Sequence, residues 1–593
     1  MALLVAWPVL AGPVDAQRAS EVARKFFQND PVSGRRFSTI HRLERYGTPL
    51  TKAGDATPAF HIFSREGGGF VIVSGDDACK PILGYSFEND FGPVDQMPEG
   101  LRDWLADFEA QVVQVRQETA RPEAVSAARS EWMAVEYPTK AGTNFKPEVL
   151  HDTPAWNQGD PFNRLCPVDG GKTSYVGCVP LAMSLVMNFF GYPAQGKGTL
   201  PSYDYELMGK SYHVDGHQLG YSYEWEKFRN VDFNKSFTDD QAKAAATFIR
   251  DVAMAGQAWF TATGTDCNFE RIVPAVLEYF GYDPNVTHLR RWYFTDKEWM
   301  NMIKGDLQDH PLIYAANKEG GGHAFVVDGY DKKDNLHINW GWGPSYNGYF
   351  ALSAFTPVEG SNYKYDHTTI LGLVPDKGQG GQPDEYLYLT SSQGGKGLSC
   401  TETPERGKTF YMDVIWFFNG GLSNFDGKVC FALTDSEGNI LERISDAGDI
   451  KELKPRGGLG LTGISCKINA YPMEGDKVRM VYRSNKWPEG VWKLPLYRLD
   501  EDVVEAIAVK ADDTKLADVT TLNYNKSDAT VSLKTMDRVN WTLKGTTGTV
   551  VGEGVSKDMA LKIPAADLAK GSYTLTLTRG KDKQVVTLKM GNK

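Results

Sequence analysis

The 593-residue sequence contains only seven cysteines. They are too sparse for a scaffold held together by disulfides, and no two of them have the C-x-x-C spacing typical of a structural zinc site. These absences argue against a small disulfide-rich domain and against a cysteine zinc centre. Because the number is odd, an exported form of the chain would keep at least one free thiol.

The sequence also lacks a block of basic residues and a long apolar run. Its formal charge is −11, from 64 Lys and Arg against 75 Asp and Glu, so no segment is suited to neutralising nucleic-acid phosphates. Past the N-terminus, no stretch approaches the roughly 18 apolar residues of a membrane span. Residues 1–16 are typical of a signal-peptide apolar region with its cleavage site, although the basic leader is missing. We therefore expect an exported protein that binds no nucleic acid and does not span a membrane.

Cys178 stands directly before an apolar run with helical spacing. The run consists of Leu181, Ala182, Leu185, Val186 and Phe189. The first turn of a helix offers unpaired backbone N–H groups and the positive end of the helix dipole. Both features lower the pKa of a thiol and favour its nucleophilic thiolate form. We therefore predict that Cys178 is a reactive cysteine at a helix N-terminus.

The region from residue 17 to about 117 has the pattern of a small α+β module. The predicted elements are a helix over 18–28, strands over 60–64 and 70–74, and an amphipathic helix over 101–115. Residues 118–143 are charged, rich in Ala and poor in core residues. We expect this segment to be an exposed linker, the kind of place where proteolysis concentrates.

Residues 141–375 form the largest predicted unit. One helix follows Cys178, and another follows a capping box that begins at Thr238. Strands are predicted later, over 312–315, 324–328, 336–340 and 349–353. Helices followed by strands favour an α+β fold over a doubly wound sheet.

Beyond a Gly- and Gln-rich linker at 376–383, the chain changes to short alternating strands with turns. Residues 573–590 are predicted to form a hairpin. We expect two β-sandwich (Ig-like) domains, over 384–510 and 511–593. Their aromatic residues, such as Trp416, Phe417 and Phe418, are interpreted as sandwich core rather than as a carbohydrate-binding platform.

His323 is the candidate base for Cys178. It precedes an apolar strand and follows three glycines, which let a ligand approach the backbone closely. It lies 145 residues after Cys178, a separation typical of papain-like enzymes. A lone histidine before a strand is usually structural, but the glycines and the matching cysteine favour a catalytic role here.

Three further residues are candidates for supporting the Cys–His pair. In the run NWGWG at 339–343, the Asn339 amide can fix a histidine ring by hydrogen bonding, and the Trp340 ring can cover the pair and exclude water. The alternative is that this run is only a strand end in a crowded core. The side-chain amide of Gln158, with the Cys178 N–H, would form an oxyanion hole, although most glutamines are solvated surface residues.

Together these blocks resemble the streptopain family of bacterial cysteine peptidases, which have the papain-like fold. The matching blocks begin with NQG at 157–159 and GCV at 177–179, and continue with GGHAFVVDG at 321–329 and NWGWG at 339–343. The ordered match spans about 144–357, and residues 60–88 resemble the family's propeptide. The resemblance implies a papain-like peptidase domain at 141–375, preceded by an inhibitory prodomain with its linker at 17–140.

The resemblance also implies roles for individual residues. Cys178 would be the nucleophile, His323 its base, Gln158 the oxyanion-hole side chain and Trp340 a support for His323, with Asn339 as a further candidate. The substrate backbone and P2 side chain would contact Gly321, Gly322, Gly264, Thr265 and Asp266. No metal and no organic cofactor is implied. The family usually continues Ala-Thr-Ala after GCV, whereas this chain has Pro180, which the first turn of a helix tolerates.

We therefore expect a cysteine endopeptidase made as a zymogen and secreted, surface-bound or periplasmic in a bacterium. Its partners would be protein or peptide substrates and its own prodomain as an intramolecular inhibitor. One alternative is another Cys–His acyl-transfer enzyme, such as an amidase or a transglutaminase-like protein. Another is a surface adhesin whose peptidase-like domain is silent. His213 and His217 are interpreted as solvated loop residues rather than metal ligands.

Overall fold

The structure is a computed structural model that describes residues 12–28, 40–42, 58–117, 122–137, 145–318, 321–354, 366–381, 384–391, 396–525, 530–556, 559–564 and 568–590. The chain divides into two compact units. The first comprises Met1–Glu385 with the short segments Gly420–Asn424 and Arg498–Asp500, and the second comprises the rest. Nearly all of the predicted signal-peptide region, residues 1–11, lies outside the described residues.

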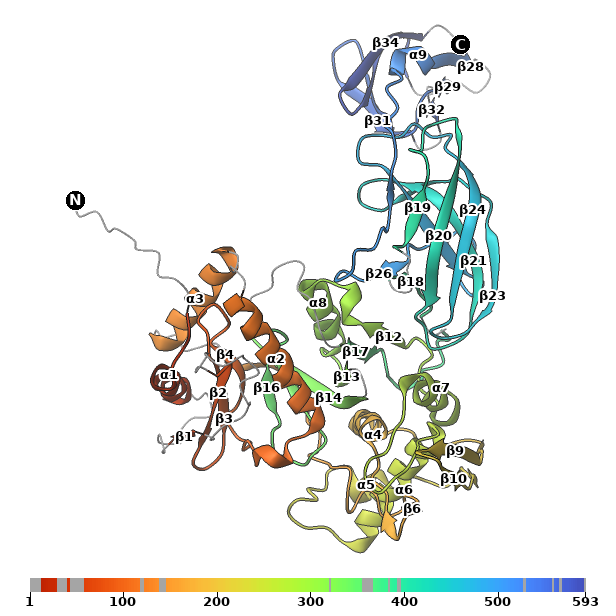
Figure 1. The fold of residues 1–593 in the computed structure, drawn as a ribbon. Helices are drawn as coiled ribbons and strands as arrows, with labels where there is room; N and C mark the ends of the chain where they lie inside the picture. Colours follow the sequence, from red (N-terminus) through yellow and green to blue (C-terminus); the bar gives the residue numbers. More distant parts are fainter. Residues whose placement is uncertain are drawn as a thin grey trace, which may run out of the picture. The chain divides into compact units, whose positions relative to one another are not determined.

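The N-terminal part of the first unit is the predicted α+β module (Figure 1). Helix α1 (Ala16–Gln28) buries Val22 and Phe26, which share one helix face, against the sheet. The sheet strands of this module are β1 (Ile40–Arg42), β2 (Phe60–Arg65), β3 (Phe70–Ser74) and β4 (Ile82–Ser86). A short helix, η1 (Val94–Gln96), precedes the long α2 (Glu99–Gln117).

Helix α3 (Pro122–Glu136) occupies most of the segment predicted as an exposed linker, so that prediction is wrong for these residues. Ala128, Trp132 and Val135 are buried at helical spacing, and α3 packs on α1. The Trp132 Nε1–H also donates to the Cys79 carbonyl at 2.8 Å. The apolar stripe is narrow and is surrounded by alanines and charged residues. The composition of the segment therefore gave no sign of a packed helix.

One continuous sheet joins this module to the peptidase region. Strand β4 pairs antiparallel with β16 (Gly348–Phe350), which places Tyr85 opposite Tyr349. The sheet continues through β15 (Leu336–Asn339), β14 (Gly321–Asp331), β13 (Leu312–Lys318), β17 (Asp366–Leu371) and β12 (Thr287–Arg290), and β5 (Pro147–Leu150) pairs with β14. The Tyr85 hydroxyl donates to the buried Asp331 carboxylate at 2.7 Å. The two parts therefore share a backbone ladder and a buried polar contact.

Helices cover this sheet and form a common core with it. The main ones are α4 (Cys178–Phe190), α6 (Asp239–Ala255), α7 (Phe269–Phe280) and α8 (Asp296–Asp306), with the short α5 (Trp225–Phe228) and η2 (Arg291–Tyr293) between them. Helix α6 begins at the predicted capping box of Thr238 and Gln241. Helix α4 lies against β14 and β13. The predicted α+β class, with helices first and strands later, is confirmed.

Three small antiparallel pairs lie among these helices. They are β6 (Val168–Asp169) with β7 (Lys172–Thr173), β8 (Thr199–Leu200) with β11 (His217–Gln218), and β9 (Tyr203–Leu207) with β10 (Lys210–Val214). Of the helices in the described ranges, none is both long and apolar enough to cross a lipid bilayer.

The second unit consists of two β-sandwiches, as predicted (Figure 1). One sheet of the first sandwich contains β18 (Leu387–Leu389), β19 (Leu398–Cys400), β20 (Thr409–Asn419), β24 (Gly458–Lys467) and β26 (Leu496–Tyr497). The other contains β21 (Phe425–Thr434), β22 (Ile440–Arg443), β23 (Gly448–Leu453), β25 (Lys477–Ser484) and β27 (Ile507–Ala508). Phe417 is fully buried, as are Phe425, Phe431 and Tyr482, so the core interpretation is confirmed for these aromatics. Trp416 and Phe418 are only half-buried.

The second sandwich follows the short helix α9 (Leu516–Val519). Its sheets are β28 (Thr521–Asn525), β29 (Thr530–Lys534) and β32 (Ala560–Pro564), and β30 (Asn540–Lys544), β31 (Val550–Val555), β33 (Gly571–Arg579) and β34 (Asp582–Met590). Leu533 and Ile563 of the first sheet and Leu543, Leu575 and Leu577 of the second share one core. The predicted hairpin is β33 with β34.

Candidate active site

Cys178 is the first residue of α4, as the sequence predicts. The preceding residue, Gly177, has φ 93°, a backbone conformation that L side chains rarely adopt. A methyl group placed on Gly177 would also lie 3.0 Å from the Thr265 side chain. Pro180 is buried in the first turn and the helix is regular through it, because the N–H that proline lacks has no helical partner there. The departure from the family pattern therefore leaves the nucleophile at the helix start.

The half-buried thiol of Cys178 differs from the buried thiols of Cys166 and Cys267. Burial alone would raise the pKa of Cys178. The charge of His323 and a hydrogen bond from His323 outweigh burial, so the pKa of Cys178 lies below its ordinary value. The backbone N–H groups of Val179 and Ala324 act in the same direction. By contrast, burial raises the pKa of Cys166 and that of Cys267 to about 12. Reactivity is thus concentrated at Cys178.

His323 lies in β14, where it pairs with Ala316 of β13, and is only 3% exposed. Its Nε2 lies 3.3 Å from the main-chain carbonyl oxygen of Trp340. The other ring nitrogen, Nδ1, is then left to face the thiol. Burial alone would lower the pKa of His323, but the Cys178 thiolate and the Trp340 carbonyl raise it above its ordinary value. Both shifts favour a thiolate–imidazolium pair.

Trp340 therefore contacts the base through its backbone as well as its ring. Its fully buried indole packs 4.7 Å from the ring of Phe325 and 5.3 Å from that of Phe350, which anchors the strand end. The Trp340 N–H donates to the Asn347 side chain at 3.0 Å. Sequence reasoning assigned Trp340 a covering role and missed its carbonyl, since every residue carries one and no side-chain pattern reveals which is used.

Asn339 does not orient His323, which corrects the predicted hydrogen bond. Its Nδ2 amide donates to the Thr153 hydroxyl at 3.1 Å and to the Pro154 carbonyl at 3.0 Å, and its Oδ1 accepts from the Gly341 N–H. The side chain is 1% exposed and fully engaged in these bonds. Asn339 therefore ties the end of β15 to the segment that leads to Gln158.

Gln158 is held beside the nucleophile by its backbone. Its carbonyl accepts a hydrogen bond from the Val176 N–H at 3.0 Å, two residues before Cys178. The side chain is half-buried. The backbone of Gln158 therefore lies beside the segment that leads into Cys178.

The loop predicted to contact substrate lies next to the nucleophile turn. Thr265 Oγ1 donates to the Tyr175 carbonyl at 2.6 Å, and Asp266 forms an antiparallel bridge with Trp259. Gly264 is exposed and has open space beside its Cα. The second predicted substrate segment is the end of the β13–β14 hairpin, where Gly322 and Gly321 pair with residues 317 and 318. The structure thus places both predicted substrate segments near the pair.

The first turn of α2 covers the base. Gly100 lies directly against the imidazole of His323. One turn further on, Trp104 packs 6.1 Å from the Trp340 ring, stacks 5.1 Å from His367, and donates its Nε1–H to the Ala351 carbonyl at 3.1 Å. Sequence reasoning gave the N-terminal module an inhibitory role but named none of these contacts.

The two loop histidines are paired with carboxylates. His213 lies 2.6 Å from Asp204 on the surface. His217 Nε2 lies 2.9 Å from the fully buried carboxylate of Asp251, so its interpretation as a solvated loop residue is wrong. Within the described ranges, no cluster of three or more His, Cys, Asp or Glu side chains has the arrangement of a metal site.

Comparison with known proteins agrees with this geometry. Residues 156–350 match the model of the Peptidase C10 family, and residues 11–112 match that of the Spi protease inhibitor. The thiol protease/hemagglutinin PrtT of Porphyromonas gingivalis is 30% identical over 406 residues, covering 66% of this chain and 46% of PrtT. The chain therefore spans about half the length of that relative.

Streptopain of Streptococcus pyogenes is 28% identical over 376 residues, covering 59% of this chain and 89% of streptopain. Among solved structures, a fragment of Prevotella intermedia prointerpain A matches with a TM-score of 0.44 and 22% identity, covering 57% of this chain and 99% of the fragment. From the family match, the ordered motifs and the relatives together, the chain contains a cysteine peptidase domain of the C10 family, the streptopain family.

Proposed function

We propose that this chain is the zymogen of a cysteine endopeptidase in which Cys178 is the nucleophile and His323 the base. The observation that carries the proposal is the pairing of the two side chains at the start of α4, with His323 Nε2 held by the Trp340 carbonyl. A lowered thiol pKa beside a raised imidazole pKa is the electrostatic pattern of an activated cysteine.

The reaction follows from these positions. The Cys178 thiolate attacks the scissile carbonyl carbon, and the developing oxyanion accepts hydrogen bonds from the Cys178 N–H and the Gln158 amide. The imidazolium of His323 then gives its proton to the leaving amine, and a thioester remains on Cys178. Neutral His323 takes a proton from water, whose oxygen attacks the thioester and releases the acid product. Trp340 acts as a positioning residue for His323.

The N-terminal module acts in this proposal as an intramolecular inhibitor. Helix α2 lies against His323 and Trp340, and strand β4 extends the sheet that carries His323. A peptide cannot reach the face of the imidazole that Gly100 covers. The match of residues 11–112 to the Spi protease inhibitor model supports the same role for the N-terminal module. Activation therefore requires proteolysis and departure of this module.

Substrates in this proposal are extended polypeptides. The loop at Thr265 and the strand end at Gly322 would contact the substrate backbone and its P2 side chain. We further propose secretion, or retention at the bacterial surface or in the periplasm, with domain limits near residues 140, 375, 383 and 510.

The direct test is N-terminal sequencing of the mature species formed by the wild-type chain and by the Cys178→Ala variant. We expect the wild type to release a peptidase that begins after the N-terminal module, and the variant to stay intact and to leave casein uncut. A Cys178→Ala variant that matured alone and cleaved casein would contradict the assignment of Cys178 as the nucleophile.

Two other readings predict different products. An amidase or transglutaminase-like enzyme would incorporate a primary amine into protein faster than it hydrolyses peptide bonds, and it would resist a peptidyl epoxide. A silent adhesin would leave Cys178 unreactive towards iodoacetamide after the N-terminal module is removed.

A further inference from the structure

A large cleft lies within the second unit, where the two β-sandwiches meet. Its volume is about 1010 Å³. The first sandwich lines it with Arg406, Gly407, Lys467, Ile468, Asn469 and Tyr471. The second lines it with the polar side chains of Thr521, Asn523, Ser532 and Lys534 on β28 and β29, with Thr535, and with the apolar side chains of Val519, Leu533, Met559 and Ala560. The cleft lies outside the peptidase domain, and the proposed reaction makes no use of it.

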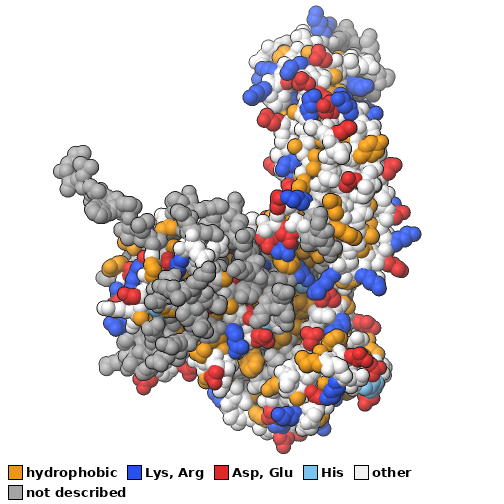
Figure 2. Space-filling model, viewed as in Figure 1, with side chains coloured by type: hydrophobic (Ala, Val, Ile, Leu, Met, Phe, Trp, Pro, Cys, Tyr) orange, Lys and Arg blue, Asp and Glu red, His pale blue; other side chains and the backbone are white. Residues whose placement is uncertain are grey.

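The charge of this cleft is opposite to that of the chain. Three of its lining residues, Arg406, Lys467 and Lys534, are cationic and none is acidic, although Arg406 already pairs with Asp512 at 3.7 Å. The whole chain, by contrast, carries −11. Lys467 and Lys534 are exposed and form no ion pair with any residue that the structure describes. On the face seen in Figure 2, by contrast, basic and acidic side chains are intermixed over these modules. The cleft is therefore a local site of positive potential.

Hydrogen-bonding groups accompany these cations in a regular array. Thr521 pairs with Lys534 across the strands and Asn523 pairs with Ser532, so the four side chains form a square on one sheet face. The side chains of Thr521, Asn523 and Ser532 make no hydrogen bond to the described parts of the chain. They leave hydroxyl and amide groups available to a ligand next to a free ammonium group.

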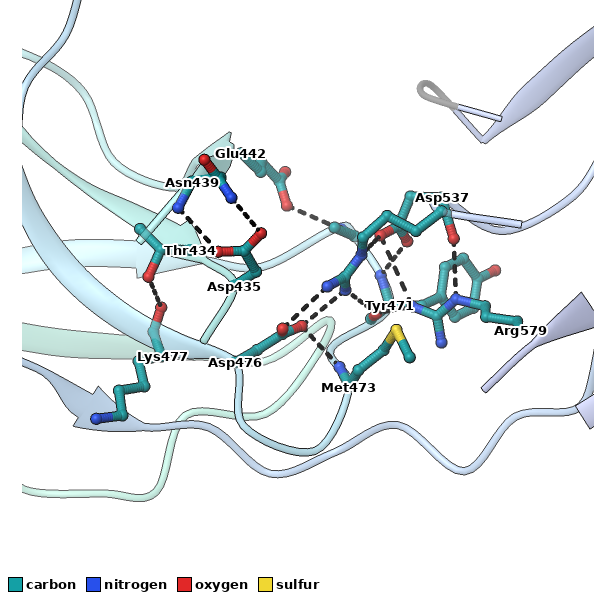
Figure 3. Close-up of polar contacts among 12 residues, drawn as sticks. Thr434, Asp435, Asn439, Glu442, Tyr471, Met473, Asp476, Lys477, Asp537 and Arg579 are labelled. Carbon is teal, nitrogen blue, oxygen red and sulfur yellow. Dashed lines mark hydrogen bonds and ion pairs between the residues drawn. The ribbon is translucent and has the colours of Figure 1, made fainter. Parts of the chain in front are cut away.

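A partly buried group of ionic contacts, here called the clamp, joins the two sandwiches (Figure 3). Arg538 of the second sandwich makes two parallel hydrogen bonds to Asp476 of the first, at 2.9 and 2.7 Å. Asp537 accepts from the Tyr471 N–H at 2.9 Å, and the Arg579 guanidinium donates to the Asp537 carbonyl. Tyr471 belongs to the clamp and to the cleft wall, so the cleft is pre-formed and binding need not order it.

Aromatic stacking is not the means of recognition here. The guanidinium of Arg406 already lies 3.5 Å from the ring centroid of Tyr471, which is 8% exposed. A neutral sugar would therefore find no open aromatic platform. An acidic peptide would pair most readily with an open strand edge, whereas this cleft presents side chains on a sheet face. A ligand rich in both hydroxyl groups and fixed negative charge matches this lining.

We infer that the cleft between the two β-sandwiches binds an acidic polysaccharide. Sulfate or carboxylate groups pair with Lys467 and Lys534, and sugar hydroxyls bond to Thr521, Asn523 and Ser532. The cleft gives the chain a carbohydrate-binding activity separate from peptide hydrolysis. It would hold the enzyme on glycan-coated surfaces, where protein substrates are concentrated.

The test uses the full chain with Cys178→Ala, which prevents self-cleavage, and a heparin octasaccharide as the sulfated probe. Isothermal titration calorimetry at physiological salt should show binding that weakens as NaCl rises. Replacing both cleft lysines, as Lys467→Glu with Lys534→Glu, should weaken binding by about tenfold or more, because two attractions become repulsions. The matched control, Lys544→Glu with Lys583→Glu, makes the same charge change on exposed lysines outside the cleft and should leave the affinity within about twofold.

A second variant separates hydrogen bonding from charge. Asn523→Leu with Ser532→Ala keeps every cation and should still weaken heparin binding severalfold. Poly-L-glutamate and neutral dextran complete the series, and both are expected to bind much more weakly than heparin. Equal losses in the cleft and control variants, or no heparin binding, would overturn the inference. Tighter binding of poly-L-glutamate than of heparin would make this a peptide site instead.

Discussion

The Cα of Gly100 lies so close to His323 that a methyl group there would be 2.6 Å from the imidazole Cδ2 and 3.0 Å from Cγ. Carbon atoms do not approach this closely without contact strain. Glycine at this position is therefore what lets helix α2 seat on the base. The Gly100 contact joins the N-terminal module to His323 by van der Waals packing, and the charge of the neighbouring Glu99 also acts on the imidazole.

Replacing Gly100 should weaken the inhibition of Cys178 in the intact chain. In the Gly100→Ala variant the added methyl group must push α2 away from His323, so we expect iodoacetamide to label Cys178 in the intact chain severalfold faster than in the wild type. Self-cleavage should begin earlier. In the proposed maturation residue 100 is removed, so the kcat/KM of the mature enzyme should be unchanged.

Gly305→Ala is the matched control, because Gly305 also lies in a helix and has open space beside its Cα. It should behave as the wild type does. Identical labelling rates in Gly100→Ala and the wild type would show that this contact does not maintain latency.

The charged pair should set the pH range of activity. A lowered Cys178 pKa keeps the thiolate present to a lower pH, and a raised His323 pKa keeps the imidazolium present to a higher pH. The ion pair therefore exists between the two pKa values, and kcat/KM should follow a bell whose acid limb titrates the thiol and whose alkaline limb titrates the imidazole. In His323→Ala, the pH profile of Cys178 alkylation should move towards that of an ordinary thiol, and kcat should fall by about a thousandfold or more.

Cys166 and Cys267, each with a pKa of about 12, supply the internal comparison. Peptide mapping after brief alkylation near neutral pH should find label on Cys178 and not on these two. Unchanged alkylation of Cys178 in His323→Ala would contradict the pairing.

Asn339 should matter for stability more than for the charge state of the pair. Asn339→Ala removes two donated hydrogen bonds from a buried site, so we expect the free energy of unfolding of the peptidase domain to fall by about 1–3 kcal/mol. Thermal unfolding measures that loss. The pH profile of Cys178 alkylation should stay close to that of the wild type, whereas a shift as large as that in His323→Ala would restore the orienting role predicted from sequence.

The clamp between the sandwiches should contribute far more to the free energy of unfolding than a surface ion pair does. Arg538→Met leaves Asp476, whose side chain is 3% exposed, with its charge unpaired. We expect the sandwiches to lose about 3 kcal/mol of stability, measured by denaturant unfolding.

Lys428→Met breaks an exposed pair with Asp449 in the same unit, and it should cost less than about 1 kcal/mol. Equal effects of the two substitutions would show that burial adds nothing to the clamp.

The sequence was most informative where local chemistry decides the structure. An apolar stripe after Cys178 specifies a helix whose first turn holds the thiol, and Thr238 specifies the start of α6 through its own hydroxyl. The family motifs then brought Gln158 and His323 to the same site. In each case the residue type at one position determines the local structure or chemistry, so the sequence alone reveals it.

What sequence reasoning missed depends on backbone atoms and on contacts across long stretches of chain. The Trp340 carbonyl that holds His323 leaves no trace in residue type. The amide of Asn339 was assigned to the wrong partner, because its true acceptors, at Thr153 and Pro154, lie about 185 residues away in the chain. Helix α3 was mistaken for a linker because its buried stripe is only a few side chains wide.

The pairing of β4 with β16 means that cutting the chain and freeing the enzyme are separate events. After a cut in the segment between the two parts, the hydrogen-bonded ladder and the Tyr85–Asp331 contact still hold the severed module in place. Its departure turns β16 from an interior strand into an edge strand. Activation should therefore show a delay between the appearance of the cleaved chain on a gel and the appearance of activity, and dilution should shorten it.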